Sequence, residues 1–574
     1  MPRGQRVLPP HIGDSLWVTE ASYIIYTKTV GGVPYYYAKN GSDGSIVSNA
    51  NFMTLWDTIK ANNTNYYFKE DIFSVATELT IQNLYNISLI GSGRGTRFVA
   101  AGDNTIIKIG HRTDSGLGAR GIHIVGIYFD GSLQTTSVAD PEANEATNYF
   151  AIAINTEGLG NTDDIFIEYC YFYNTGSDSI YGWDRSNVNI NNCVFKACRG
   201  YWAAIHQHGP QNHANNILYS WTVTGCSFKD CIAGIRHSEI ITNNVFTGCG
   251  SSARSLATIT AGMYGGIIND NKIYNAKHIG IKAFGATGIG GIGYTISHNY
   301  VNTDPTVLTA IGIDAQTGSS ATILRYVTID SNTIYGTGGI GIHGSRLQYS
   351  TITNNIVADS CLAWAYSAIR LRTEGGNPSI HNIVSGNIIY SSGGSLAQYG
   401  IQELDVTTDY NNIFDNKVLT YSIGAIQQQG PHTKIYGNEG YIAPGEPRFA
   451  SGSLTAGVAN AICFAWNNPE AQDILIKKVV IEVTTGGGTA GSHLDVGIAD
   501  DAAGTNRGTE FFDDLLLNTA QIDDSWVAGD GGTQIKWVFC DDSAAVANDW
   551  VVGQILDANA ASLVGRYYIE YVGR

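Results

Sequence analysis

A short motif of polar and apolar positions recurs along the middle of the chain, between residues 191 and 440. Each copy holds an Asn or Cys, and in every copy but the last an apolar or aromatic residue follows two places later, as in Asn332 and Ile334. The Asn/Cys column consists of Cys170, Cys193, Cys226, Asn244, Asn271, Asn299, Asn332, Asn355, Asn387, Asn416 and Asn438. A fixed motif with spacers of varying length predicts a solenoid whose coils share one core and differ in their turns.

Alternation within each copy, as in Thr351-Ile352-Thr353, predicts β-strands rather than helices. Coils that each contain several short strands are typical of a parallel β-helix. An Asn at the same bend of every coil can satisfy backbone groups, and stacking one Asn on the next repeats that hydrogen bond along the axis. We therefore interpret the column as structural rather than catalytic.

The pattern divides the chain into three parts. Residues 1–75 form an N-terminal capping region, where apolar residues at helical spacing predict a short amphipathic helix over residues 51–63 that covers the open end of the solenoid. The parallel β-helix is expected over residues 76–442. Short alternating strands between Gly- and Asp-rich turns predict an acidic C-terminal β-sandwich over residues 443–574. The expected fold class is thus all-β.

Composition and charge narrow the function classes. The 574 residues include 68 Gly and only 14% charged side chains, which fits an elongated all-β protein with many turns. The net charge of −17 argues against nucleic acid and anionic membrane as partners. We find no apolar run typical of a signal peptide or a membrane span, so we expect no membrane insertion and, if the protein acts extracellularly, release by a route such as lysis.

The nine cysteines predict buried free thiols rather than disulfides or zinc ligands, because six of them occupy two repeating positions of neighbouring coils. No cofactor is expected. Pairs of acidic residues such as Asp513-Asp514 in the C-terminal region are candidate calcium ligands, although solvated turns are the commoner interpretation. His206 and His208 would share a strand face without a third ligand, so we assign no metal site.

A second alignable strand in each coil begins with an inward aliphatic residue, such as Ile342. Side chains one and three places later should point outward, about 4.8 Å from their counterparts in the next coil. The first outward column is Tyr181, His206, Arg236, Tyr264, Lys282, Asp314, His343, Arg370, Gln402 and Gln427. The second is Trp183, His208, Ser238, Gly266, Phe284, Gln316, Ser345, Arg372, Leu404 and Gln429. We call these two columns the outer strip.

Aromatic, imidazole and cationic side chains concentrate on the outer strip, which fits an extended glycan better than a small molecule. Aromatic side chains there can stack on sugar rings, and the cations can bind carboxylates or sulfates. The candidate substrate-binding residues are Tyr181, Trp183, His206, Arg236, Lys282, Phe284 and Arg372.

Two chemistries fit the strip. Glycoside hydrolysis needs two carboxyls that flank the scissile bond, as Asp314 would with Glu374 or Glu403. β-Elimination from a uronic acid needs a cation that neutralises the carboxylate and a base such as Lys282, His343 or an Arg; adjacent Asp314 and His343 would form a polarised pair. The candidate catalytic residues are Asp314, His343, Arg370, Glu374 and Glu403. The competing interpretation is an ordinary polar sheet face or a groove that binds sugar without reaction.

The coil pattern, together with the sequence ISLIGSGRGTRF that starts at Ile87, resembles the pectate-lyase-like family of right-handed parallel β-helices over about residues 76–442. The helix-capped N-terminal region, the acidic C-terminal region and the lack of a signal peptide make the chain more similar to phage tailspikes than to secreted enzymes. The resemblance implies a homotrimeric virion protein, in contact with other virion proteins, that binds and often cleaves a host surface polysaccharide. The alternative is a structural or adhesive virion protein that binds glycan without cleaving it.

Overall fold

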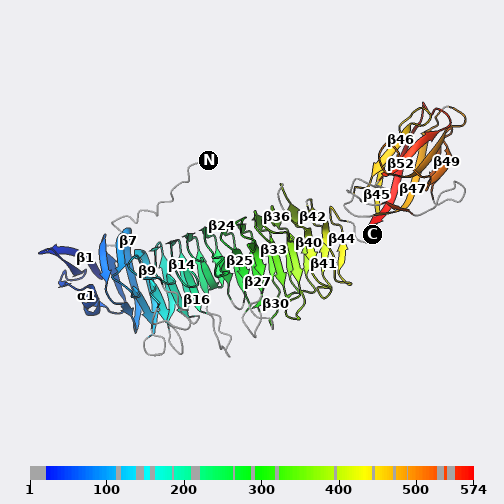
Figure 1. Cartoon of the computed structure of the whole chain (residues 1–574). Coiled ribbons are helices and arrows are strands. Elements are labelled where there is room, and N and C mark those ends of the chain that lie inside the picture. Colours follow the sequence, from blue (N-terminus) through cyan, green and yellow to red (C-terminus); the bar gives the residue numbers. More distant parts are fainter. Residues whose placement is uncertain are drawn as a thin grey trace. The chain divides into compact units, whose positions relative to one another are not determined.

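The computed structural model describes residues 21–573 except 111–117, 137–147, 156–161, 184–186, 209–219, 263–264, 286–290, 317–321, 393–396, 420, 442–446, 470–473, 488, 526–535 and 539–549. The chain forms two compact units, one of residues 1–411 with 428–432 and one of residues 412–427 with 433–574. Figure 1 shows the stacked coils that make up most of the first unit.

Three parallel faces form the β-helix of the first unit, and most coils contribute one strand to each face. Face 1 contains β11 (Asp163–Glu168), β14 (Val188–Asn191), β17 (Trp221–Thr224), β20 (Ile240–Thr242), β23 (Gly266–Asn269), β27 (Tyr294–Ser297), β31 (Thr328–Asp330), β35 (Thr351–Thr353) and β38 (Ile383–Ser385). Face 2 contains β12 (Tyr171–Tyr173), β15 (Val194–Lys196), β18 (Ser227–Lys229), β21 (Val245–Thr247), β24 (Lys272–Ala276), β28 (Tyr300–Thr303), β32 (Thr333–Tyr335), β36 (Ile356–Ala358) and β39 (Ile388–Tyr390). The long strands β7 (Leu84–Ala100) and β9 (Ala119–Asp130) continue through both faces.

Face 3 carries the strands in which the outer strip was predicted. Its order is β40 (Tyr399–Glu403), β37 (Ile369–Arg372), β33 (Ile342–Ser345), β29 (Ile311–Ala315), β25 (Ile279–Ala283), β22 (Ala257–Ala261), β19 (Ile235–Ser238), β16 (Ile205–His208), β13 (Ile180–Trp183), β10 (Ile152–Asn155), β8 (Ile107–Gly110) and β6 (Leu79–Ile81). A short sheet of β26 (Gly291–Ile292), β30 (Leu324–Arg325) and β34 (Leu347–Gln348) lies in the turns. The predicted right-handed parallel β-helix is confirmed.

The predicted Asn ladder lies at the bend between face 1 and face 2. Asn332 donates from its backbone N–H and from Nδ2 to Asn355 Oδ1 at 3.0 Å, and Nδ2 also donates to the Ile296 carbonyl at 2.8 Å. Ser331, directly before it, has φ 55°, and this single residue in the left-handed conformation turns the chain from face 1 to face 2. Because Asn355 repeats the pattern with Asn387, each rung satisfies its neighbour. The structural interpretation of the column agrees with these bonds.

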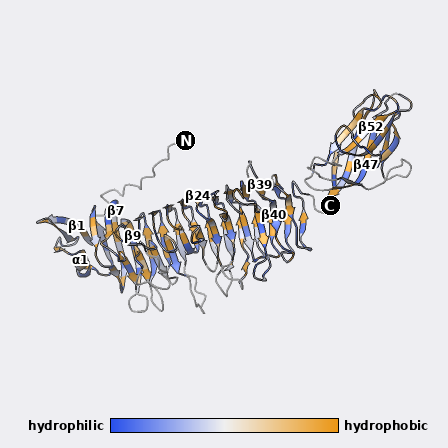
Figure 2. Cartoon of the chain, viewed as in Figure 1, coloured by the Kyte–Doolittle hydropathy of each residue, from blue (hydrophilic) through white to orange (hydrophobic). Residues whose placement is uncertain are grey.

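Stacked side chains fill the interior of the coils. Phe172, Phe195, Phe228 and Phe246 stack with ring centroids 4.6 to 4.7 Å apart and interplanar angles below 10°. The described cysteines are free and buried, as predicted; Cys540 lies outside the described residues. Figure 2 shows hydrophobic and hydrophilic residues mixed along the strands, as expected when the two sides of a strand face core and solvent.

The N-terminal region caps the β-helix with β1 (Tyr23–Val30), β2 (Val33–Asn40), β3 (Ile46–Asn49), α1 (Phe52–Ile59), β4 (Thr64–Phe68) and β5 (Asp71–Val75). The Asn51 side chain caps α1 by accepting bonds from the backbone N–H groups of Met53 and Thr54. Phe52 packs on Phe73 with ring centroids 5.4 Å apart, so the helix covers the first coils. The helix was predicted to reach residue 63 but ends at Ile59, because the chain turns there to begin β4.

The second unit begins with four short strands, β41 (Asn412–Phe414), β42 (Lys417–Val418), β43 (Gly424–Gln427) and β44 (Lys434–Tyr436). Two antiparallel sheets follow. One contains β45 (Pro447–Ser453), β53 (Val564–Gly573), β47 (Ile474–Thr485), β50 (Gln521–Asp524) and β51 (Lys536–Val538); the other contains β46 (Ile462–Asn467), β52 (Trp550–Leu556), β48 (His493–Ala499) and β49 (Phe512–Leu516). Buried side chains from both sheets, including Ile481 and Val496, form one core, which confirms the predicted sandwich.

Candidate functional site

Strand pairing on face 3 fixes the register of the outer strip. The first outward column is Tyr181, His206, Arg236, Thr260, Lys282, Asp314, His343, Arg370 and Gln402. It matches the prediction except at β22, where Thr260 takes the place expected for Tyr264. The strand starts directly after the turn closed by the Ser251 to Leu256 bridge, earlier than expected. Tyr264 lies outside the described residues.

Asp314 and His343, one coil apart, form the predicted polarised pair. Asp314 Oδ1 lies 2.9 Å from His343 Nδ1, and both side chains are buried. Burial alone would raise the pKa of the Asp314 carboxyl, but the hydrogen bond from His343 and the positive charges of His343, Lys282 and Arg372 lower it. An ionised carboxylate only accepts, so Nδ1 of His343 donates the hydrogen bond of this pair.

The Nε2 atom of His343 is buried and has no hydrogen-bond partner among the residues that the structure describes. An imidazole held by a carboxylate at one nitrogen and open at the other is the arrangement of a general base. The pair therefore offers a proton acceptor in the middle of the outer strip.

Cations flank this pair on both sides along the strip. Lys282 Nζ lies 3.9 Å from Asp314 Oδ2 in the coil before it. Arg370 pairs in register with His343 in the next coil, and its guanidinium lies over the Tyr366 ring at 5.2 Å. Burial and the charge of Arg372 lower the pKa of Arg370, yet an arginine stays protonated at neutral pH. The site thus combines one base with positive charge that can neutralise an anion.

Glu374 is a fixed anion rather than a proton donor. Its Oε2 accepts hydrogen bonds from Gln316 Nε2, Ser345 Oγ and Arg346 Nη2 at 2.7 to 2.8 Å, and Arg372 Nη2 lies 3.0 Å away. Burial would raise its pKa, but these bonds and the two arginines lower it to about 2. The side chain is therefore ionised and orients Arg372.

Glu403 does not reach the outer strip, which corrects its assignment as a catalytic candidate. It pairs in register with the inward Leu371, is fully buried, and accepts bonds from Asn411 Nδ2 at 2.8 Å and from the Gly430 N–H at 3.0 Å. A buried carboxylate with these donors satisfies backbone and side-chain groups inside the coil. Its role is structural.

The carboxyl geometry favours base chemistry over hydrolysis. A glycosidase needs one protonated acid and one ionised carboxylate at the bond. Asp314 and Glu374 both have lowered pKa values, and both are already engaged as acceptors. Neither is suited to donate a proton to a leaving oxygen at neutral pH.

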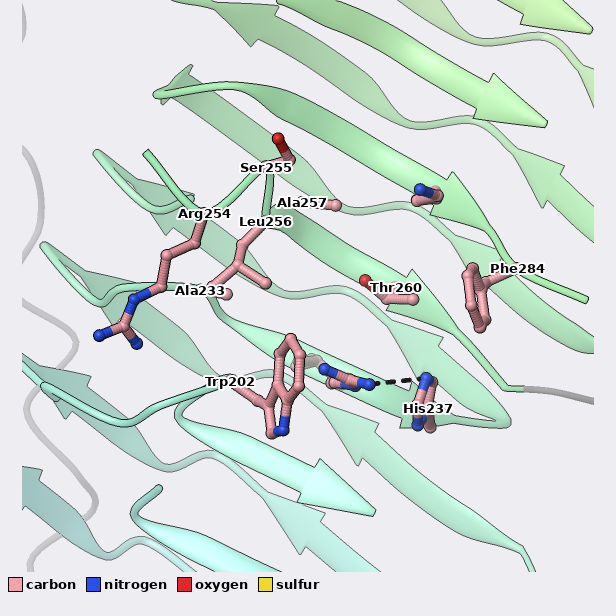
Figure 3. A pocket seen from close by; sticks show the side chains of 12 residues that line it. Trp202, Ala233, His237, Arg254, Ser255, Leu256, Ala257, Thr260 and Phe284 are labelled. Atoms are coloured by element: carbon pink, nitrogen blue, oxygen red, sulfur yellow. Dashed lines mark hydrogen bonds between the residues drawn. The ribbon is translucent and has the colours of Figure 1, made fainter. Parts of the chain in front are cut away.

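A pocket of about 240 Å³ opens on the same strip, next to Lys282, and Trp202, Arg236, His237, Arg254 and Phe284 also line it. Figure 3 shows the side chains of Trp202, His237 and Phe284 around it. The Arg236 guanidinium lies 3.6 Å from the centroid of the Trp202 ring, and its Nε donates to His237 Nε2 at 3.3 Å.

A bulge in β19 positions His237. The register shifts between Arg236 and Ser238, and His237 has φ 68° although it is not a glycine. A bulge re-aims one side chain out of the strand's alternation, and strained conformations of this kind gather at functional sites. Here the imidazole ring lies 5.9 Å from the Phe284 ring and nearly parallel to it, which closes one side of the pocket.

Tyr181 and His206 lie below the accessible surface. Tyr181 is fully buried, and its ring stacks on Phe150 at 4.7 Å, so it does not offer a face to a sugar. His206 is also fully buried and lies 2.9 Å from Asp178 Oδ2 through its Nδ1. These positions correct the expectation that both bind substrate directly. The side chain of Trp183 lies outside the described residues.

Sequence reasoning did not identify Trp202, Arg254, His237, Asp178 and Arg346. Trp202 and Arg254 lie on turns before face 3, where spacing varies and no periodic signal exists. Arg346 directly follows β33, and a search for cations near predicted acids would have found it. Asp178 lies two residues before Ile180, on the turn that leads into β13.

Acidic side chains of the second unit approach one another, as the calcium hypothesis requires. One group contains His493, Asp514 and Asp557, and another contains Asp495, Asp513 and Asp514, with ligand atoms within 4.8 Å of one another in each. His493 Nδ1 lies 3.1 Å from Asp557 Oδ2, so an ion pair already accounts for part of the first group. Calcium binding stays a prediction. Among the described residues, no helix is long and apolar enough to cross a membrane.

The sequence matches no protein-family model and no curated protein. Its structure is similar to the A-module of the mannuronan C-5 epimerase AlgE4 from Azotobacter vinelandii, at TM-score 0.42 and 15% identity, over 67% of this chain and 94% of that one. It is also similar to tailspike protein 3 of bacteriophage CBA120, at TM-score 0.45 and 10% identity, over 73% and 66%. A tailspike of Escherichia coli bacteriophage HK620, in complex with a pentasaccharide, matches at TM-score 0.39 and 10% identity, over 89% and 75%. These proteins share the parallel β-helix with this chain.

Proposed function

We propose that this chain is a virion-associated tailspike that binds an acidic host surface polysaccharide along the outer strip and depolymerises it by β-elimination. The observation that carries the proposal is the Asp314-held His343 between Lys282 and Arg370, whose buried Nε2 has no hydrogen-bond partner among the described residues. The resemblance stated above adds a homotrimer in the phage tail, in contact with other virion proteins and acting outside the cell.

The reaction needs only groups that the strip supplies and one water molecule. His343 Nε2 takes the C5 proton of a uronate unit while Arg370 and Arg372 neutralise its carboxylate and stabilise the charge that develops there. The C5–H electron pair becomes the C4–C5 double bond, the C4–O bond breaks, and the departing oxygen takes a proton from water. Asp314 keeps the imidazole in the required tautomer and stabilises the imidazolium that forms.

One observation favours the alternative of an adhesin that binds without cleaving. The His343 side chain is only about 5% exposed, so a substrate must displace neighbouring groups or enter a tight contact to reach Nε2. Cationic and aromatic groups along the strip would support glycan binding in either case.

The test incubates the purified protein with acidic and neutral bacterial polysaccharides and follows reducing ends together with the ultraviolet absorbance of unsaturated uronates. We expect both signals to rise on an acidic polymer. His343→Gln should abolish both while binding is kept, and Asp314→Asn should reduce turnover by about 10²-fold or more, the typical contribution of a positioned base. The control is His298→Gln, an exposed histidine at a bend between faces 1 and 2.

Reducing ends without new absorbance would contradict elimination and direct attention to Asp314 and Glu374 as a hydrolytic pair. Binding without either signal on every polymer tested would contradict catalysis and support the adhesin. Retained cleavage in His343→Gln would refute the assignment of the base.

A further inference from the structure

The pocket beside Lys282 is lined by three cationic side chains in a protein that is acidic as a whole, and one of them, Lys282, also lies 3.9 Å from the Asp314 carboxylate. Arg236, Arg254 and Lys282 line it, and none of its described lining residues is an Asp or a Glu. The chain carries a net charge of −17. A hollow lined by one sign of charge concentrates ligands of the opposite sign. The pocket is therefore suited to an anion.

Its walls fit a sugar ring better than a bare inorganic ion. Trp202 and Phe284 provide aromatic surface, and Thr260 and Ser255 provide hydroxyl groups. Two of the three cations are held against these rings, with the Arg236 guanidinium 3.6 Å from the Trp202 centroid and Lys282 Nζ 5.5 Å from the Phe284 centroid. Arg254 lies over the Tyr201 ring instead, at 4.8 Å, and donates to the Tyr201 carbonyl at 2.8 Å. Side chains that are already ordered lose less entropy when a ligand binds.

The volume fits one monosaccharide. A pocket of about 240 Å³ corresponds to about eight water molecules at roughly 30 Å³ each. Pockets for drug-sized ligands begin at about 300 Å³. This volume suits one sugar ring, with room along the strip for the neighbouring units of a polymer.

Its place on the strip separates it from the proposed base. Lys282, at one edge of the pocket, lies two coils before His343 in the outward column, roughly 9.6 Å along the axis at about 4.8 Å per coil. Arg236 lies two coils further away. A ring in the pocket cannot present its own C5 proton to His343.

We propose that the pocket is an anchoring subsite for one anionic sugar unit of the glycan, distinct from the unit that loses its proton. The inference rests on the proposed glycan-binding function and adds that the polymer carries a second charged unit near the cleaved linkage. The guanidinium groups of Arg236 and Arg254 favour an anionic sugar over a neutral one. The aromatic rings of Trp202 and Phe284 favour a sugar ring over an inorganic anion.

The test measures saturation-transfer NMR of D-glucuronate, its methyl ester and glucose, at millimolar concentration, with the full chain. We expect glucuronate to bind about five-fold or more tightly than the ester and glucose, because charge-assisted bonds are the stronger kind. Arg236→Gln should lose this preference. Arg566→Gln, which removes one positive charge from a guanidinium near Tyr568 in the C-terminal sandwich, is the matched control and should keep it.

Equal binding of glucuronate and its ester by the wild type would overturn the subsite, and this comparison does not depend on any variant folding. An equal loss in Arg236→Gln and Arg566→Gln would also overturn it, because general charge would then explain the binding. If sulfate competes for the pocket as effectively as glucuronate, the pocket is a simple anion site, and the proposal that it recognises a sugar ring is refuted. If no polysaccharide is cleaved but the glucuronate preference persists in wild type and in His343→Gln, the elimination fails and the subsite stands.

Discussion

Replacing Asn332 with Ala removes one rung of the Asn ladder, and the structure gives the expected cost. Asn332 is buried, and its Oδ1 accepts from the backbone N–H and from Nδ2 of Asn299, each at 3.0 Å. Its Nδ2 donates to the Ile296 carbonyl at 2.8 Å. The Ala variant leaves the Asn299 N–H without its acceptor and the Ile296 carbonyl without this donor. At about 1–3 kcal/mol for each of these two unsatisfied buried groups, the loss is about 2–6 kcal/mol.

Large β-helical proteins unfold slowly, so the assay should measure a rate as well as a melting temperature. Unfolding in guanidinium, followed by tryptophan fluorescence, should be faster in Asn332→Ala than in wild type. The control is Asn302→Ala, since the half-buried Asn302 donates to the Tyr335 carbonyl at 2.9 Å and accepts from the Asn275 N–H at 3.1 Å. Both bonds lie near solvent, so water can replace them and the variant should cost less than Asn332→Ala. Equal unfolding rates and midpoints for the two variants would refute the ladder as a stabilising element.

Two further predictions concern the acid pH range and the N-terminal cap. The pKa of Glu374 is lowered from 4.5 to about 2, so its bonds to Arg346 and Arg372 stabilise the fold above about pH 4.5 and this stabilisation disappears as the pH falls towards 2. As the pH is lowered over this range, the melting temperature of Glu374→Gln should therefore fall less steeply than that of the wild type. Parallel curves for the two proteins would contradict a stabilising role of the Glu374 carboxylate. Trp56 is fully buried and donates from Nε1 to the Thr80 carbonyl at 3.1 Å, so Trp56→Ala should cost about 3–5 kcal/mol and expose the N-terminal region to limited proteolysis, whereas the exposed Asp57→Ala should leave the digestion pattern unchanged.

The parts of the fold that follow a local repeat could be predicted from the sequence. The Asn column identified the ladder because the same side chain makes the same bond at the same bend in each coil. The repeat and the alternation within each strand also predict that Asp314 lies beside His343, because adjacent strands of a parallel face bring equivalent residues into contact. Both predictions depend only on strand register, which a repeated pattern specifies.

Residues whose positions depend on turns could not be predicted in the same way. Trp202 and Arg254 reach the pocket from turns of unrelated length, and Tyr181 is covered by Phe150, which lies outside the aligned strands. Glu403 is different, because it lies two residues after the inward Ile401 and alternation places its side chain inward as well. The hydrogen bonds that it accepts from Asn411 and Gly430 show that a buried carboxylate can satisfy groups inside the coil without facing a ligand.

The pocket forms where the repeat of face 3 is broken. A bulge places His237 out of the alternation, and the turn closed by Ser251 and Leu256 carries Arg254 to the opening. Faces 1 and 2, which hold the Phe stack and the Asn ladder, keep an unbroken register through the same coils. In a solenoid each coil is stabilised mainly by contacts with its neighbours. Turns before face 3 can therefore change length and residue type at little cost to the core, and we expect the specificity of the proposed subsite to be set in those turns.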